Sequence, residues 1–248
     1  MIAFRLSTAR LLPLLSAACL LSAANAEAAP SVAYPQPNPS ADEQFMLECI
    51  NVARANPTAE GQMLAGLNDA TIQMYYSHYG VSAAALLSDF ASYAAKPPLA
   101  MNTQLMASAR GHSQDMATRG FQQHNSSDGT TFSQRISNQG YNWSGAGENI
   151  YAYSEGAFFG HVGFNADWGV PTLDHRHNIM NSEPGSPLFR EVGISCVPSS
   201  KPGFGPMVIT QDFARPMDST VAYVVGVVYN DANGNGLTTR ARVSPTSA

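Results

Sequence analysis

The chain has 248 residues, of which 44% are hydrophobic and 12% are charged, a balance that is typical of a globular protein with a sizeable core. It carries 13 Lys and Arg against 18 Asp and Glu, and this acidic excess disfavours nucleic acid and anionic membranes as partners. The three cysteines show no spacing that resembles a zinc-binding cysteine cluster.

The first 26 residues have the pattern of a signal peptide. Arg5 and Arg10 precede an apolar run, Leu11 to Leu21, that is too short to cross a bilayer, and Ala24-Asn25-Ala26 is a small-x-small cleavage site. We therefore expect a secreted or periplasmic protein that is cleaved near Ala26. A lipid anchor at Cys19 is an alternative, but the residues before it do not fit a lipobox. No later apolar run approaches the length of a membrane span.

Residues 27–40 are rich in Ala, Pro and Ser, and they predict an extended linker before a domain that covers residues 41–216. Ser40 and Glu43 form a capping-box pattern that predicts the start of a helix, which should end before Pro57. One face of this helix is apolar, with residues spaced by three and four: Met46, Cys49, Ile50 and Ala53.

Residues 59–98 have a looser pattern that indicates broken helical pieces, and we expect His78 to be a surface or packing residue there. Asn102 as N-cap and Gly120 as terminator predict a second long helix. His112 falls on the apolar face of that helix, so the pattern favours a hydrogen-bonded core histidine over a ligand.

The rest of the domain reads as short elements. We expect a loop around His124, a short helix at 131–139, a Trp/Gly/Ser loop at 141–146, a strand or buried turn at 147–151, and a short helix within 155–169. Residues 189–197 and 207–213 read as antiparallel strands joined by a Gly/Pro turn. Helices that enclose late paired strands predict an α+β fold.

The segment 217–248 carries a different pattern. Residues 221–229 read as an apolar strand, and Asp231, Asn233 and Asn235 stand at positions 1, 3 and 5 of a partial calcium loop. Arg242 occupies position 12, where such a loop needs a bidentate Glu. Calcium binding is therefore doubtful, and a β-turn is the competing interpretation.

Cys49 and Cys196 remain after cleavage of the signal peptide. In an exported protein a cysteine pair often forms a disulfide, but both residues lie in apolar stretches where free thiols also occur. The sequence leaves both alternatives open.

Six motifs in order give the domain a family resemblance: Pro98-Leu99-Ala100, Phe121 to His124 with Asp128-Gly129, Gly147 to Ile150, His175 to Met180, Glu191 to Ile194, and Gln211 to Phe213. Together they resemble the bacterial, SCP-like extracellular branch of the CAP superfamily. The resemblance implies an α-β-α sandwich, here followed by a short C-terminal β extension.

The resemblance also implies an open cleft in which His124, Glu148 and His175 meet. The segment before His175 is longer than the family pattern. A second carboxylate is therefore not evident in the sequence, and Asp167 and Asp174 are the candidates, with His161 as a third.

Two neutral imidazoles and one carboxylate match a divalent-metal site, with zinc as the expected ion. We expect a binding protein for a lipid, a glycan or a protein partner. The alternatives are a metal-assisted hydrolase of peptides or cell-envelope material and a structural or adhesive surface module. The sequence shows no clear nucleophile held by a base.

Overall fold

The protein is represented by a computed structural model that describes residues 38–218 and 220–226. In chain order the elements are α1 (Ala41–Ala55), α2 (Pro57–Ala65), α3 (Ala70–Tyr79), α4 (Ala83–Ser92), β1 (Ala100–Met101), α5 (Thr103–Arg119), α6 (Phe132–Asn138), β2 (Trp143–Ser154), α7 (Ala157–Ala166), α8 (Asp174–Met180), β3 (Glu191–Pro198) and β4 (Met207–Pro216). No helix within the described ranges is long and apolar enough to cross a membrane.

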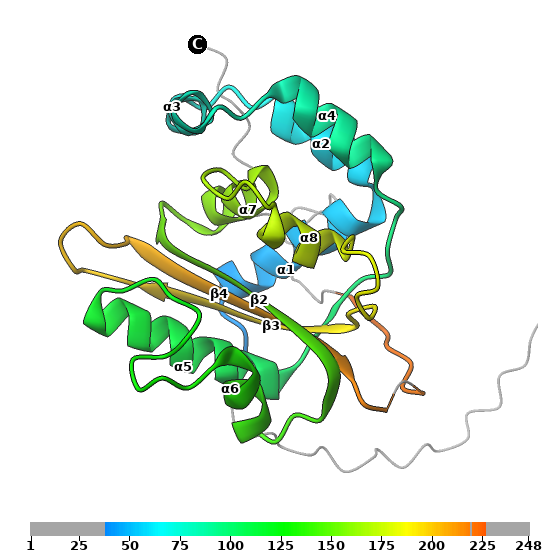
Figure 1. The fold of residues 1–248 in the computed structure, drawn as a ribbon, viewed down its shortest axis with the longest axis vertical. Helices are drawn as coiled ribbons and strands as arrows, with labels where there is room; N and C mark the ends of the chain where they lie inside the picture. The colour runs from blue at the N-terminus through cyan, green and yellow to red at the C-terminus, as the bar shows by residue number, and fades with distance from the viewer. Residues whose placement is uncertain (1–37, 219, 227–248) are drawn as a thin grey trace, which may run out of the picture. The chain divides into compact units, whose positions relative to one another are not determined.

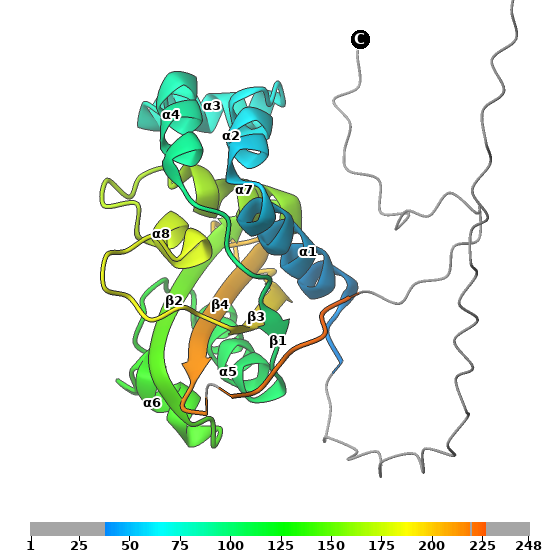
Figure 2. The ribbon, with the colours of Figure 1, turned by 90° about the vertical axis from the view of Figure 1, so that its right-hand side faces the viewer.

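The strands form one mixed sheet in the order β1-β3-β4-β2, so β2 is an edge strand. β1 pairs in parallel with β3, whereas β4 pairs antiparallel with both β3 and β2. Helices α5 and α6 lie on one face of the sheet, and α1, α7 and α8 lie on the other (Figures 1 and 2). This arrangement confirms the predicted α+β fold with an α-β-α sandwich.

The predicted starts and ends of the two long helices are confirmed. Ser40 and Glu43 form both hydrogen bonds of the capping box at α1. Asn102 caps α5 by accepting from the backbone N–H groups of the second and third residues of the helix, and Gly120 ends α5 in the left-handed conformation, with φ of 74°. These caps satisfy backbone groups that have no partner inside the helix.

Residues 59–98 contain helical pieces, as predicted, in the form of α2, α3 and α4 (Figure 1). Tyr76 ties α3 to α2 by donating a hydrogen bond to the carbonyl of Leu64 at 3.2 Å. His78 is exposed and its ring lies 4.6 Å from that of Tyr79, which confirms the prediction of a surface residue.

Two other predictions differ from the structure, and one helix was not predicted. Residues 143–146 belong to β2 rather than to a loop, because they pair with the end of β4. Residues 174–180 form α8, for which we made no prediction. Residues 221–226 are not in a strand, although we expected one at 221–229. The signal peptide, most of the linker and the calcium-loop residues Asp231, Asn233 and Asn235 lie outside the described residues.

Gly193 lets α5 approach the sheet closely. A Cβ atom at this position would overlap the backbone of Leu105 and Met106 on α5, so only glycine fits without a shift. Gly193 stands opposite Asp212 in the pairing of β3 with β4. This close contact brings the polar residues of α5 next to the buried centre of the sheet.

No disulfide joins Cys49 and Cys196 in the structure, so the disulfide alternative is not formed. Burial raises the pKa of the Cys196 thiol, which keeps it protonated and unreactive. We therefore expect a reductant to leave the melting temperature unchanged in thermal denaturation. A Cys49–Cys196 bridge would instead contribute about 2–4 kcal/mol, and its reduction would lower the melting temperature by several degrees.

Candidate functional site

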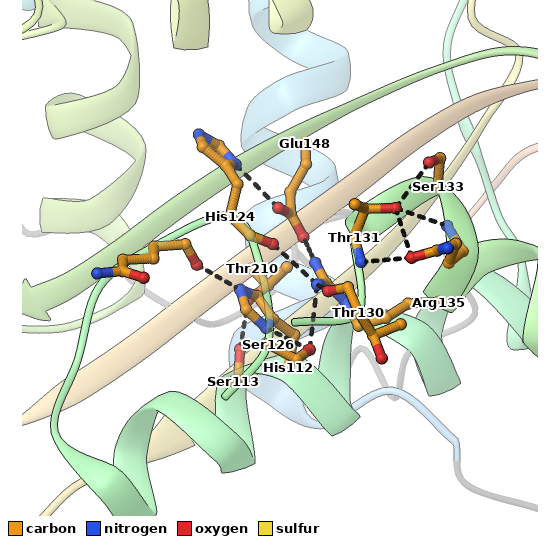
Figure 3. A network of polar contacts seen from close by, with 12 residues as sticks. His112, Ser113, His124, Ser126, Thr130, Thr131, Ser133, Arg135, Glu148 and Thr210 are labelled. Carbon is orange, nitrogen blue, oxygen red and sulfur yellow. Dashed lines mark hydrogen bonds and ion pairs between the residues drawn. The ribbon is translucent and has the colours of Figure 1, made fainter. Parts of the chain in front are cut away.

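His124 and Glu148 meet at the edge strand β2. The Nδ1 atom of His124 lies 2.9 Å from Oε1 of Glu148, and Figure 3 shows the two side chains facing each other. The carboxylate is fully buried, whereas the imidazole is 54% exposed. The fold therefore brings His124 and Glu148, two of the residues expected in the cleft, into contact.

Arg135 on α6 holds the same carboxylate and the loop that carries His124. Its Nη2 donates to Oε2 of Glu148. Its Nη1 donates to the carbonyl oxygen of His124 at 2.8 Å, to Oγ of Ser126 at 3.2 Å and to the carbonyl oxygen of Thr130 at 3.2 Å (Figure 3). One buried guanidinium therefore fixes both partners of the His124–Glu148 pair.

Asp212 on β4 is a second buried acid beside Glu148. The two residues stand opposite each other in the pairing of β2 with β4, and Asp212 is completely buried. Neither of its carboxyl oxygens has a partner with hydrogen-bond geometry in the described part of the chain. Burial, followed by the nearby charge of Glu148, raises the pKa of Asp212 well above its ordinary value. Arg135 thus pairs with Glu148, and Asp212 lies beside this pair, where the charge of Arg135 only partly offsets the raised pKa.

His175 forms a separate pair with Asp167. Its Nδ1 lies 2.7 Å from Oδ1 of Asp167, and the carboxylate is fully buried while the imidazole is 17% exposed. The other carboxylate oxygen accepts from the backbone N–H of Arg176 at 3.0 Å. Asp167 ends α7 in the left-handed conformation, with φ of 55°, which turns its side chain towards α8. Of the two candidate carboxylates, Asp167 is the one that contacts a cleft histidine.

The two pairs lie on opposite faces of β2. Side chains alternate along a strand, so Asn149 points away from the face that carries Glu148. Asn149 donates to the carbonyl oxygen of His175 at 3.1 Å and accepts from Nδ2 of Asn178 at 2.9 Å, both on α8. The two histidines therefore come from the two sides of the edge strand β2, and an ion bound by both would lie at its free edge.

The remaining candidates lie elsewhere. Asp174 is exposed and accepts a hydrogen bond from Thr172 at 2.6 Å. His161 is buried, with its Nε2 2.7 Å from Oε1 of Glu60 on α2. His112 is fully buried and bonds the carbonyl oxygen of Gln123, which confirms its prediction as a core histidine.

Within residues 38–218 and 220–226, no group of three or more His, Cys, Asp or Glu side chains is arranged so that it could hold a metal ion. Both carboxylate oxygens of Glu148 are already engaged, by His124 and by Arg135. The donors that remain for a metal are the Nε2 atoms of His124 and His175, which make no hydrogen bond within the described chain.

The sequence analysis missed Arg135 and Asp212. The local sequence carried little signal, because α6 is mostly polar around Arg135 and Gln211 precedes Asp212, and a buried charge is recognised only together with its partner. Arg135 precedes the buried Ile136 on α6, and Asp212 lies between Gln211 and Phe213 in a strand that is buried along most of its length.

Comparisons with known proteins bear on this fold. No curated protein matches the chain significantly. A crystal structure at 1.5 Å resolution, of an extracellular protein containing a SCP domain from Bacillus anthracis str. Ames, is similar to the chain with 23% identity and a TM-score of 0.37. That match covers 58% of this chain and 39% of the other, and at this level of similarity we draw nothing from it.

The model of the CAP, or cysteine-rich secretory protein, family matches residues 47–213. This range runs from α1 to β4 and includes all three layers of the sandwich as well as both histidine–carboxylate pairs. Because the match covers well over half of the chain, the protein belongs to the CAP family.

Proposed function

We propose that the protein is an exported CAP-domain binding protein in which His124 and His175 bind a divalent metal ion, with zinc as the preferred ion, through their Nε2 atoms. Glu148 and Asp167 orient the two rings and do not bind the metal themselves. The observation that carries this proposal is that a fully buried carboxylate holds Nδ1 of each imidazole, at 2.9 and 2.7 Å.

A carboxylate on Nδ1 has a defined effect on an imidazole. The Nδ1–H group donates to the carboxylate, so the lone pair of the neutral ring lies on Nε2, which is the usual arrangement of metal-binding histidines. The imidazole rings of His124 and His175 are both accessible to solvent. Both residues therefore present a nitrogen of the kind that zinc prefers.

Two imidazoles leave coordination positions open on a tetrahedral ion. A partner can fill these positions, which suits a binding protein for a lipid, a glycan or a protein surface, the partner classes that we expect from the family resemblance. The signal-peptide pattern of residues 1–26 supports the proposal that the protein acts outside the cytoplasm. The acidic composition supports partners other than nucleic acid.

The hydrolase alternative has less support from the geometry. It needs Glu148 as a ligand or as a general base, but both oxygens of this carboxylate are held by His124 and Arg135 on a fully buried side chain. No contact in the described residues favours a purely adhesive role.

Isothermal titration of the metal-free protein with zinc tests the proposal. We expect about one ion per chain for the wild type, and at least tenfold weaker binding for His124→Ala and for His175→Ala. His177→Ala is the matched control, because this histidine lies on the same helix as His175 but pairs with the exposed Glu183. Equal zinc affinity in the wild type and in both site variants would refute the metal site.

A further inference from the structure

Ser126 and the buried His112 form a contact that the metal site does not use. Nε2 of His112 lies 2.9 Å from the carbonyl oxygen of Gln123, and since a carbonyl can only accept, Nε2 carries the proton. Nδ1 is therefore the ring nitrogen with the lone pair. It lies 3.4 Å from Oγ of Ser126 (Figure 3). This is the arrangement of a serine hydroxyl beside its base, with a third group that fixes the tautomer of the base.

Arg135 lies on the other side of the same hydroxyl. Its Nη1 donates to Oγ of Ser126 at 3.2 Å, so the hydroxyl hydrogen is free to point towards His112. A cation at this distance stabilises negative charge on Oγ as the proton leaves. Burial lowers the pKa of His112 below 6.5, so the imidazole is neutral and able to accept a proton at pH 7.

Ser126 lines a small open pocket of about 230 Å³ beside α5 and α6. The pocket is also lined by Ser108, Asp128, Thr130, Arg135 and Asn138. Ser108 is almost fully buried, and its hydroxyl lies beside the carboxyl group of Asp212, whose pKa it acts to lower. A pocket of this volume has room for a short acyl group beside these polar side chains.

We propose that Ser126 is a nucleophile, with His112 as its general base, that accepts short acyl groups from esters of polar alcohols. Oγ bonds to the ester carbonyl carbon while its proton passes to Nδ1 of His112. The alcohol then leaves with that proton, and a water molecule hydrolyses the acyl-serine in the same way. The reaction needs neither a metal ion nor the imidazoles of His124 and His175. This proposal is therefore independent of the proposed metal site.

A fluorophosphonate with small alkyl groups tests the nucleophile directly, because its P–F bond breaks as a stable Oγ–P bond forms and fluoride leaves. We expect one adduct per chain in the presence of EDTA, located at Ser126 by peptide mass analysis. Ser126→Ala should abolish the adduct, and Ser127→Ala is the matched control because this neighbouring hydroxyl bonds Asp115 instead. His112→Gln should slow labelling by about 100-fold or more.

The pH dependence of labelling in the wild type gives a second readout that does not depend on how the His112 variant folds. Glu148 and Asp115 act on the pKa of His112 to raise it, whereas Arg135 and burial lower it, and the net effect is a lowered pKa. Labelling should therefore rise with pH and reach half of its maximum below pH 6.5. Absence of an adduct at Ser126, or a rate that keeps rising above pH 8, would overturn the proposal.

Discussion

Arg135→Met is expected to lower the free energy of unfolding by about 3–5 kcal/mol, because it leaves the buried carboxylate of Glu148 without its cation. The side chain of Arg135 is 8% exposed and that of Glu148 is fully buried. The change also removes the hydrogen bonds from Nη1 to the loop that carries His124. Urea denaturation at pH 7 measures the loss, and methionine keeps the apolar part of the side chain.

Two variants separate the buried charge from general effects of removing arginine. Arg119→Met removes an exposed arginine whose ion pair with Asp115 lies on the surface of α5, and it should change stability by less than about 1 kcal/mol. Glu148→Gln in the Arg135→Met background should recover part of the loss, because no unpaired charge remains. Similar losses for Arg119→Met and Arg135→Met would show that the buried ion pair has no special role.

Asp212→Asn is expected to change how stability depends on pH. The raised pKa of Asp212 means that the folded protein holds a proton that the unfolded chain releases above about pH 4. The stabilising contribution of this proton is complete below the unfolded pKa and is lost as pH rises towards the folded pKa. In that window the stability of the wild type should fall relative to that of the variant by up to about 1.4 kcal/mol for each pH unit.

Urea denaturation of both proteins at a series of pH values from 4 upwards measures this difference. The amide of asparagine has nearly the same shape as the carboxyl group but does not titrate, so Asp212→Asn isolates the one proton. Glu183→Gln is a suitable control, since its side chain is 62% exposed and should leave the pH dependence unchanged. Parallel curves for the wild type and Asp212→Asn would contradict a protonated Asp212.

Local patterns predicted the ends of elements well. The capping box at Ser40, the N-cap at Asn102 and the terminator at Gly120 depend on hydrogen bonds and backbone angles within a few residues, and all three are present. The apolar face of α5 also placed His112 correctly in the core. Such features need no knowledge of the rest of the chain.

Contacts between distant residues could not be read in the same way. Glu148 and Asp212 are far apart in sequence, and they stand opposite each other only because of the register between β2 and β4. That register is determined by the turns and by the neighbouring strands together. The contact of Asp167 with His175 depends on the left-handed end of α7 at a non-glycine residue, which no local preference predicts. The sequence led us to predict a cleft with His124, Glu148 and His175, but it did not predict that these residues would be divided between the two faces of β2.

Nitrogen-detected NMR of the histidine side chains tests the central claim most directly, because it reports which ring nitrogen carries the proton and which binds a metal. For metal-free protein at pH 7.5, the proposal predicts the Nδ1–H tautomer for His124 and His175, and a large shift of both Nε2 signals when one equivalent of zinc is added. His112 serves as an internal reference, since it should keep its Nε2–H tautomer throughout. Nε2–H tautomers at His124 and His175, with spectra that zinc leaves unchanged, would contradict the account.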